Sequence, residues 1–139
     1  MHNIWIADDD EAIRLVLEES LSSAGFKTKS FSSGDDLVSE LESSEPDLII
    51  TDVQMPGMLG YDLLKHITNN YEDLPVIVMT AFADMQAAVE SFGGGAFEYM
   101  PKPFDLEDAI KIVERALEEK PKTKGLKKDT KLDIIGESQ

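Results

Sequence analysis

Polar side chains able to bind a small phosphorylated ligand follow four short apolar runs in this 139-residue chain. Three carboxylates come directly after the first run, a fourth follows a later one, and a hydroxyl and an ammonium end two others. These residues are Asp8, Asp9, Asp10, Asp52, Thr80 and Lys102. Each of them taken alone has a more ordinary interpretation, as part of a helix N-terminus, a loop or the solvated surface. Their coincidence at the ends of four similar runs favours one shared site.

The carboxylates predict a divalent cation. If Asp8 and Asp52 end neighbouring strands, their negative charges lie close together and raise each other's pKa unless a cation sits between them. Oxygen ligands of this kind suit Mg²⁺, which binds carboxylates, water and phosphate oxygens. With Lys102 as a further positive charge and Thr80 as a hydroxyl donor, the set has the equipment to accept a phosphoryl group.

The elements that must position these residues alternate along the chain. Short apolar runs predict strands, and apolar residues at three- and four-residue spacing predict helices, such as the stripe of Ile13, Val16, Leu17 and Leu21. The expected strands are 3–7, 27–31, 48–51, 76–80 and 97–100, and the expected helices are 10–23, 33–41, 62–70, 84–92 and 105–117. This alternation predicts a parallel sheet between two layers of helices, with the ligand site beyond the carboxyl ends of the strands.

Charge limits the partners of the chain. The formal net charge is −15, divided into −18 for residues 1–119 and +3 for residues 120–139. Nucleic-acid phosphates would repel a segment as negative as residues 1–119. We therefore expect no direct contact of this segment with DNA or RNA.

The compartment is constrained by what the sequence lacks. There is no cysteine, and the first residues have neither the basic nor the apolar segment of a signal peptide. The longest uncharged apolar stretch, 74–83, is about half of the roughly 20 residues that span a membrane. We therefore expect a soluble, cytoplasmic protein with no membrane contact.

Four segments together resemble the receiver domain of two-component response regulators. They are the acid pair at 8–9, DVQMPG at 52–57, MTA at 79–81 and KPF at 102–104, in the order that the family has. The resemblance covers about residues 1–119. It implies a flavodoxin-like (CheY-like) α/β fold: a doubly wound, five-stranded parallel sheet of order 2-1-3-4-5 with five helices.

The resemblance also implies a phosphorylation site with a metal. Asp52 would be the phospho-acceptor, and Asp8 and Asp9 would hold Mg²⁺, with Asp9 favoured as the direct ligand. Gln54 would add its backbone carbonyl to the metal, alongside Asp52. Asp10 is a third acid in the same run, which leaves the assignment of the pair open by one position.

Three more residues take expected roles from the family. Lys102 would bind the phosphoryl oxygens, and its peptide bond to Pro103 is expected to be cis. Thr80 and Tyr99 match the switch pair, in which the hydroxyl moves to the phosphoryl group and the ring turns inward. Leu59 stands where the family commonly has an acid, a departure that concerns loop contacts only.

The end of the chain resembles a narrower group. AFEYMPKPFD at 96–105 and IIGES at 134–138 are similar to the NtrC-like, σ54-dependent transcriptional activators. In that group an IIGES-like segment opens an AAA+ ATPase domain, which a DNA-binding domain follows. The resemblance therefore divides the chain into a receiver domain (1–119), a lysine-rich linker (120–133) and the first residues of a truncated AAA+ domain (134–139).

The resulting functional hypothesis is a phosphorylation-controlled switch. A sensor histidine kinase would phosphorylate Asp52, and the phosphorylated domain, as a homodimer, would control its own AAA+ output domain. The domain itself would be no enzyme beyond Mg²⁺-dependent self-phosphorylation and autodephosphorylation.

Three alternatives remain open. One is a receiver that stands alone without an output domain. A second is an aspartyl-phosphate phosphohydrolase, which would need a general acid where Gln54 stands. The third is a flavin carrier, which would need a phosphate cradle where the three aspartates stand.

Overall fold

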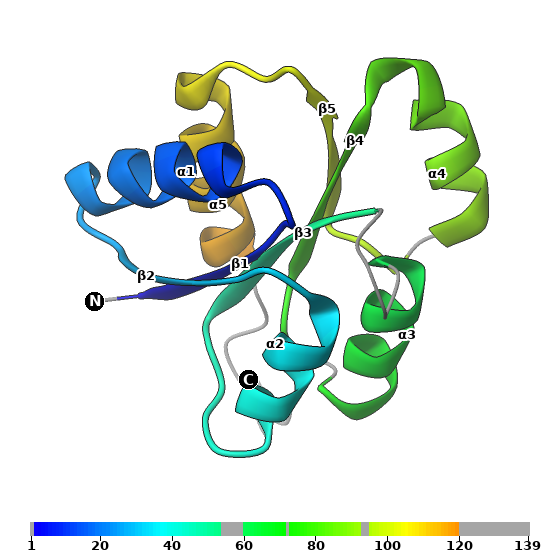
Figure 1. Ribbon diagram of the computed structural model, residues 1–139, viewed down its shortest axis with the longest axis horizontal. Helices are drawn as coiled ribbons and strands as arrows, with labels where there is room; N and C mark the ends of the chain where they lie inside the picture. The colour runs from blue at the N-terminus through cyan, green and yellow to red at the C-terminus, as the bar shows by residue number, and fades with distance from the viewer. Residues whose placement is uncertain (1, 54–59, 72, 93–94, 120–139) are drawn as a thin grey trace, which may run out of the picture.

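Five parallel strands form the centre of the computed structural model, which describes residues 2–53, 60–71, 73–92 and 95–119 (Figure 1). The strands are β1 (Asn3–Ala7), β2 (Lys27–Phe31), β3 (Leu48–Asp52), β4 (Val76–Ala81) and β5 (Glu98–Lys102). They form one sheet of order β2-β1-β3-β4-β5, in which every pair is parallel. The predicted strand order 2-1-3-4-5 is thus confirmed.

Five α-helices cover the two faces of this sheet. They are α1 (Glu11–Ser23), α2 (Gly34–Leu41), α3 (Gly60–Asn70), α4 (Met85–Phe92) and α5 (Leu106–Glu119). Helices α1 and α5 lie on one face, and α2, α3 and α4 lie on the other (Figure 1). A short 3₁₀ helix, η1 (Phe82–Asp84), precedes α4 and was not expected from the sequence.

The core has two halves because the side chains of a strand alternate between the faces of the sheet. In β1, Ile4 and Ile6 join the cluster under α1 and α5, whereas Trp5 and Ala7 join the cluster under α2, α3 and α4. Every residue of β3 is buried. A parallel strand covered on both faces reads as a continuous apolar run, which is why the sequence predicts these strands well.

The apolar stripe of α1 is narrower than the sequence predicts. Leu17 and Leu21 are fully buried and Ile13 packs at the margin of the core, but Val16 is 42% exposed. Ile13, Leu17 and Leu21 follow one another at four-residue spacing, and this row faces the sheet. Val16 lies about 100° around the helix from Leu17, which turns its side chain to solvent. Its assignment to the buried stripe was wrong.

Local signals fix several ends of the helices. The side chain of Ser33 accepts a hydrogen bond from the N–H of Asp36 at 3.2 Å and caps α2. The side chain of Asp105 accepts one from the N–H of Glu107 at 2.8 Å, just before α5. Gly25 follows α1 with a φ of +99°, a conformation that glycine adopts without steric cost.

Candidate metal centre

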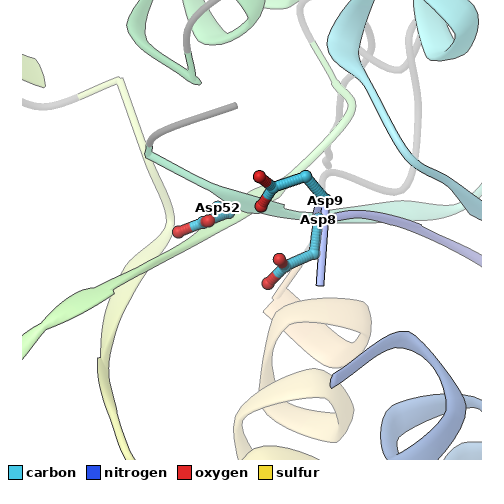
Figure 2. Close-up of side chains that lie close together, drawn as sticks. All are labelled: Asp8, Asp9 and Asp52. Carbon is cyan, nitrogen blue, oxygen red and sulfur yellow. The ribbon is translucent and has the colours of Figure 1, made fainter. Parts of the chain in front are cut away.

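Three carboxylates meet at the carboxyl edge of the sheet. Asp8 and Asp9 directly follow β1, and Asp52 is the last residue of β3. The two strands are neighbours, with Ala7 opposite Thr51, so the residues that follow this pair lie side by side. Each of the three side chains offers a carboxylate oxygen within 4.8 Å of the other two (Figure 2). The structure therefore brings together the acids that the sequence predicted.

Two carboxylates of the cluster are buried and the third is exposed. Asp8 is 0% exposed and Asp52 is 8% exposed, whereas Asp9 is open to solvent. Burying two carboxylates side by side is unfavourable unless positive charge compensates them. An ion could reach the cluster from the side of Asp9 and find oxygen donors from all three acids, the donor set that Mg²⁺ prefers.

Lys102 supplies positive charge to this cluster. It ends β5, and its Nζ lies 3.0 Å from Asp8 Oδ2 and 3.2 Å from Asp52 Oδ1. The ammonium therefore bridges the two buried acids. Its peptide bond to Pro103 is cis, as the family resemblance implied.

The balance of these charges appears in two pKa shifts. Burial raises the pKa of the Asp52 carboxyl, and the negative charge of Asp8 raises it further, which together outweigh the lowering by Lys102. For Lys102, burial favours the neutral amine, but the hydrogen bond with Asp8 and the attraction of both acids outweigh it and raise its pKa. The site therefore keeps a charged lysine while it disfavours the charge on Asp52.

Asp8 is held by hydrogen bonds from four parts of the fold. Its N–H donates to the Phe31 carbonyl of β2 at 3.1 Å, and its Oδ1 accepts from the Asp10 N–H at 2.9 Å. Its carbonyl oxygen accepts from Arg14 Nη1 at 2.7 Å, and its Oδ2 from Lys102. Asp8 therefore uses its amide, its carbonyl and both carboxylate oxygens in hydrogen bonds.

Asp10 has a different position from the other two acids of its run. Its carboxylate accepts a hydrogen bond from the N–H of Ala12 at 2.9 Å and caps α1. The carboxylate cluster found among the described residues contains Asp8, Asp9 and Asp52, without Asp10. The geometry thus favours Asp8 and Asp9 as the acid pair. Gln54 and Leu59, which the sequence also singled out, lie outside the described residues.

Thr80 lies on β4 with its hydroxyl buried. The residue is 1% exposed, and within the described part of the chain its Oγ1 has no hydrogen-bond partner. A buried hydroxyl without a partner is costly, so such a group is a candidate contact for an incoming ligand.

Tyr99 lies on the neighbouring strand β5. Thr80 pairs with Pro101, two residues beyond Tyr99, so both side chains belong to the same face of the sheet. Tyr99 is half-buried and packs against the cluster under α2, α3 and α4, and burial raises the pKa of its phenol. The two residues of the expected switch pair are therefore on adjacent strands and one face.

Sequence reasoning missed Arg14. It lies in the first turns of α1, where the helix dipole disfavours a positive charge. A cation at that place in an otherwise acidic helix start is a signal that it has a specific partner nearby, here the carbonyl of Asp8.

Fold and site together define a class of protein. Residues 4–114 match the family model described as the response regulator receiver domain, and the chain belongs to this family. Within the described ranges, no helix combines the length and the apolar character needed to cross a bilayer.

The similar proteins narrow the group to NtrC-like regulators. The chain is 44% identical to the DNA-binding transcriptional regulator NtrC of Escherichia coli K12 over 140 residues, which cover 97% of this chain and 30% of that protein. It is 43% identical to the protein of the same name from Klebsiella pneumoniae, with coverages of 96% and 29%. The chain thus spans less than a third of the length of these relatives.

Solved structures agree with this group. The apo receiver domain of nitrogen regulatory protein C is 45% identical and superposes with a TM-score of 0.77, covering 84% of this chain and 94% of that one. The response regulator TrrA of Thermotoga maritima, solved in complex with Mg²⁺ and BeF, is 28% identical with a TM-score of 0.76 and coverages of 84% and 99%.

Proposed function

We propose that this domain accepts a phosphoryl group on Asp52 from a sensor histidine kinase and thereby switches an attached output domain. One observation carries the proposal: a buried aspartate at the end of β3 shares its surroundings with two further carboxylates and a lysine. Carboxylates placed so close without a metal repel one another, which suits a site built to receive a cation and a phosphoryl group.

Asp8, Asp9, Asp52 and the backbone carbonyl of Gln54 would hold Mg²⁺. The bound ion would neutralise negative charge on the transferring oxygens and on the acceptor. The fit rests on the donor set, which consists of oxygen atoms only, and on the closeness of the three carboxylates. TrrA, a structural relative, was solved with Mg²⁺ and BeF, which supports the same use of the site here.

Asp52 acts as the nucleophile in the proposed transfer. A carboxylate oxygen forms a bond to phosphorus while the phosphorus–nitrogen bond of the kinase phosphohistidine breaks, and the bonding pair remains on the imidazole nitrogen. Only the ionised form of Asp52 attacks. Lys102, 3.2 Å from Asp52, favours that ionised form and is close enough to bind an oxygen of the arriving phosphoryl group.

The phosphoryl group would then be read by the switch pair. The hydroxyl of Thr80, which has no partner among the described residues, gains an acceptor in a phosphoryl oxygen, and Tyr99 turns inward behind it. Such a change shifts the population between two packings of β4, α4 and β5, because the phosphoryl group contacts Thr80 in one of them only.

The wider roles rest on the NtrC relatives. They are called DNA-binding transcriptional regulators and are more than three times as long as the matched segment. We infer that residues 120–133 link the receiver to an AAA+ output domain that begins near residue 134, that the protein works as a homodimer in the cytoplasm, and that DNA contacts belong to other domains.

Incubation with acetyl phosphate and Mg²⁺ followed by intact-mass measurement tests the proposal. The wild-type protein is expected to gain about 80 Da, the mass of one phosphoryl group, and to lose it on standing. Asp52→Asn is expected to gain nothing, and Asp36→Asn, an exposed acid of α2, is the matched control that should react like wild type. Mass gain in Asp52→Asn, or none in the wild type, would overturn the proposal.

A further inference from the structure

Arg14 holds the backbone beside the exposed acid of the cluster. Its Nη1 donates to the carbonyl oxygen of Asp8 at 2.7 Å, across six positions of the chain. We propose that Arg14 is a positioning residue that orients Asp9 for the metal. This inference rests on the proposed function, because Asp9 is the expected direct ligand of Mg²⁺.

The geometry of two peptide planes carries the argument. The Asp8 carbonyl lies in the peptide plane that precedes the Cα of Asp9, and the Asp10 N–H lies in the plane that follows it. Arg14 holds the first plane through that carbonyl. Asp8 Oδ1 holds the second plane, because it accepts from the Asp10 N–H at 2.9 Å. With both flanking planes held, the backbone of Asp9 has a fixed conformation and its side chain a fixed starting direction.

The sheet alone does not provide this constraint. The last paired residue of β1 is Ala7, and the hydrogen bond from the Asp8 N–H to Phe31 is the last one that joins this segment to β2. Beyond that point, Asp9 is exposed and lies between β1 and α1. A ligand that is ordered before the metal arrives loses less conformational freedom on binding. Partners that orient metal ligands commonly change metal affinity by about 10–100-fold when they are removed.

Charge and position make opposite predictions for Arg14. If Arg14 acted only through its positive charge, its removal would make the acidic cluster more attractive to a cation and tighten Mg²⁺ binding. If it orients Asp9, its removal weakens Mg²⁺ binding in spite of the lost repulsion. The sign of the change therefore separates the two roles.

The test compares two arginines of the described chain. Arg14→Met removes the guanidinium and keeps an apolar stem, and Arg14→Gln, with a polar end, serves the same purpose if the first variant does not fold. Arg115→Met is the matched control, because Arg115 on α5 pairs with Glu98 at 3.4 Å and lies over Phe97, away from the cluster. Three quantities are measured: the Mg²⁺ dissociation constant by calorimetry, the melting temperature in EDTA, and hydrogen exchange of the Asp10 amide in EDTA.

We expect Arg14→Met to raise the Mg²⁺ dissociation constant about tenfold and to speed exchange of the Asp10 amide. Arg115→Met should leave the Mg²⁺ dissociation constant and the exchange rate of the Asp10 amide within about twofold of their wild-type values, whether or not it changes the melting temperature. A dissociation constant for Arg14→Met that is unchanged or lower overturns the inference. If wild type binds no Mg²⁺, the proposed function fails instead. In that case hydrogen exchange of the Asp10 amide in EDTA tests the role of Arg14 by itself. If Arg14→Met leaves the exchange rate unchanged, the positioning role is overturned.

Discussion

The fold disfavours the negative charge of the Asp52 carboxylate. Its raised pKa means that the folded protein holds the proton more tightly than the unfolded chain does. For such an acid the destabilisation is absent at pH values below both pKa values, grows as pH rises above the ordinary value of 3.8, and is complete once pH exceeds the raised pKa of the folded state. The proposed phospho-acceptor is thus a residue whose charge destabilises the fold.

Neutralising Asp52 should therefore stabilise the metal-free protein. Asp52→Asn is expected to raise the free energy of unfolding in EDTA by about 0.5–2 kcal/mol at pH 7, and by less at pH 4. Urea denaturation at both pH values measures it. Glu19→Gln, which removes an exposed acid in the middle of α1, should change the free energy of unfolding by less than about 0.5 kcal/mol. A loss of stability in Asp52→Asn at pH 7 would show that Lys102 outweighs burial and Asp8.

Single residues also show where sequence reasoning stops. Asp8, Asp9 and Asp52 could be predicted as one cluster because strand ends of a parallel sheet share an edge. Arg14 could not, because its hydrogen bond to the Asp8 carbonyl depends on how the turn after β1 places the first turns of α1. The absence of a partner for the Thr80 hydroxyl among the described residues is likewise a property of packing alone.

The sequence predicts the alternation of strands and helices better than it predicts the residues at which these elements end. The buried strands β1, β3 and β4 read as apolar runs. All five strands were predicted, but β3, β4 and β5 extend past the predicted ends to Asp52, Ala81 and Lys102. These residues belong to strands because a neighbouring strand pairs with them, as Asp52 pairs with Met79. Two of these ends, Asp52 and Lys102, are polar and give no apolar signal in the sequence, and both belong to the carboxylate cluster and its ion pairs.

The strand β4 offers a prediction of its own. Thr80→Val removes a buried hydroxyl that lacks a partner in the described chain and keeps the branched shape that a strand favours, so it should stabilise the unphosphorylated protein by about 1 kcal/mol. It should also block the switch, seen as the loss of phosphorylation-dependent chemical-shift changes in α4. Urea denaturation and NMR spectra measure the two effects.

Thr51 of β3 provides the control for that variant. It is equally buried, but its Oγ1 donates to the Asp52 carbonyl at 3.1 Å, so Thr51→Val should lower stability by about 1 kcal/mol. Equal effects of the two substitutions would mean that the Thr80 hydroxyl is already satisfied.

The net charge of the chain changes sign after residue 119, the last residue that the structure describes. Residues 1–119 hold a net charge of −18, and α5 ends at Glu119 after burying Ala109, Val113 and Ala116 against the sheet. The proposed linker of 120–133 contributes six lysines and none of the described core. The domain boundary is therefore expected at Glu119.

A chain that ends at Glu119 should keep the stability of the full chain. We expect its melting temperature to lie within about 2 °C of that of the full chain, since no buried residue of the described core is removed. Its Mg²⁺ affinity should also be retained, because the carboxylates and Lys102 are all present. A fall of more than about 5 °C would place part of the core beyond residue 119.

Locating the phosphoryl group on the chain tests the central claim most directly. Borohydride reduces an aspartyl phosphate to homoserine, so reduction after treatment with acetyl phosphate and Mg²⁺ marks the acceptor for peptide sequencing by mass spectrometry. The account predicts homoserine at position 52 and at none of the neighbouring acids, Asp8, Asp9 or Asp10. Homoserine at another position, or none in a protein that had bound Mg²⁺, would contradict it.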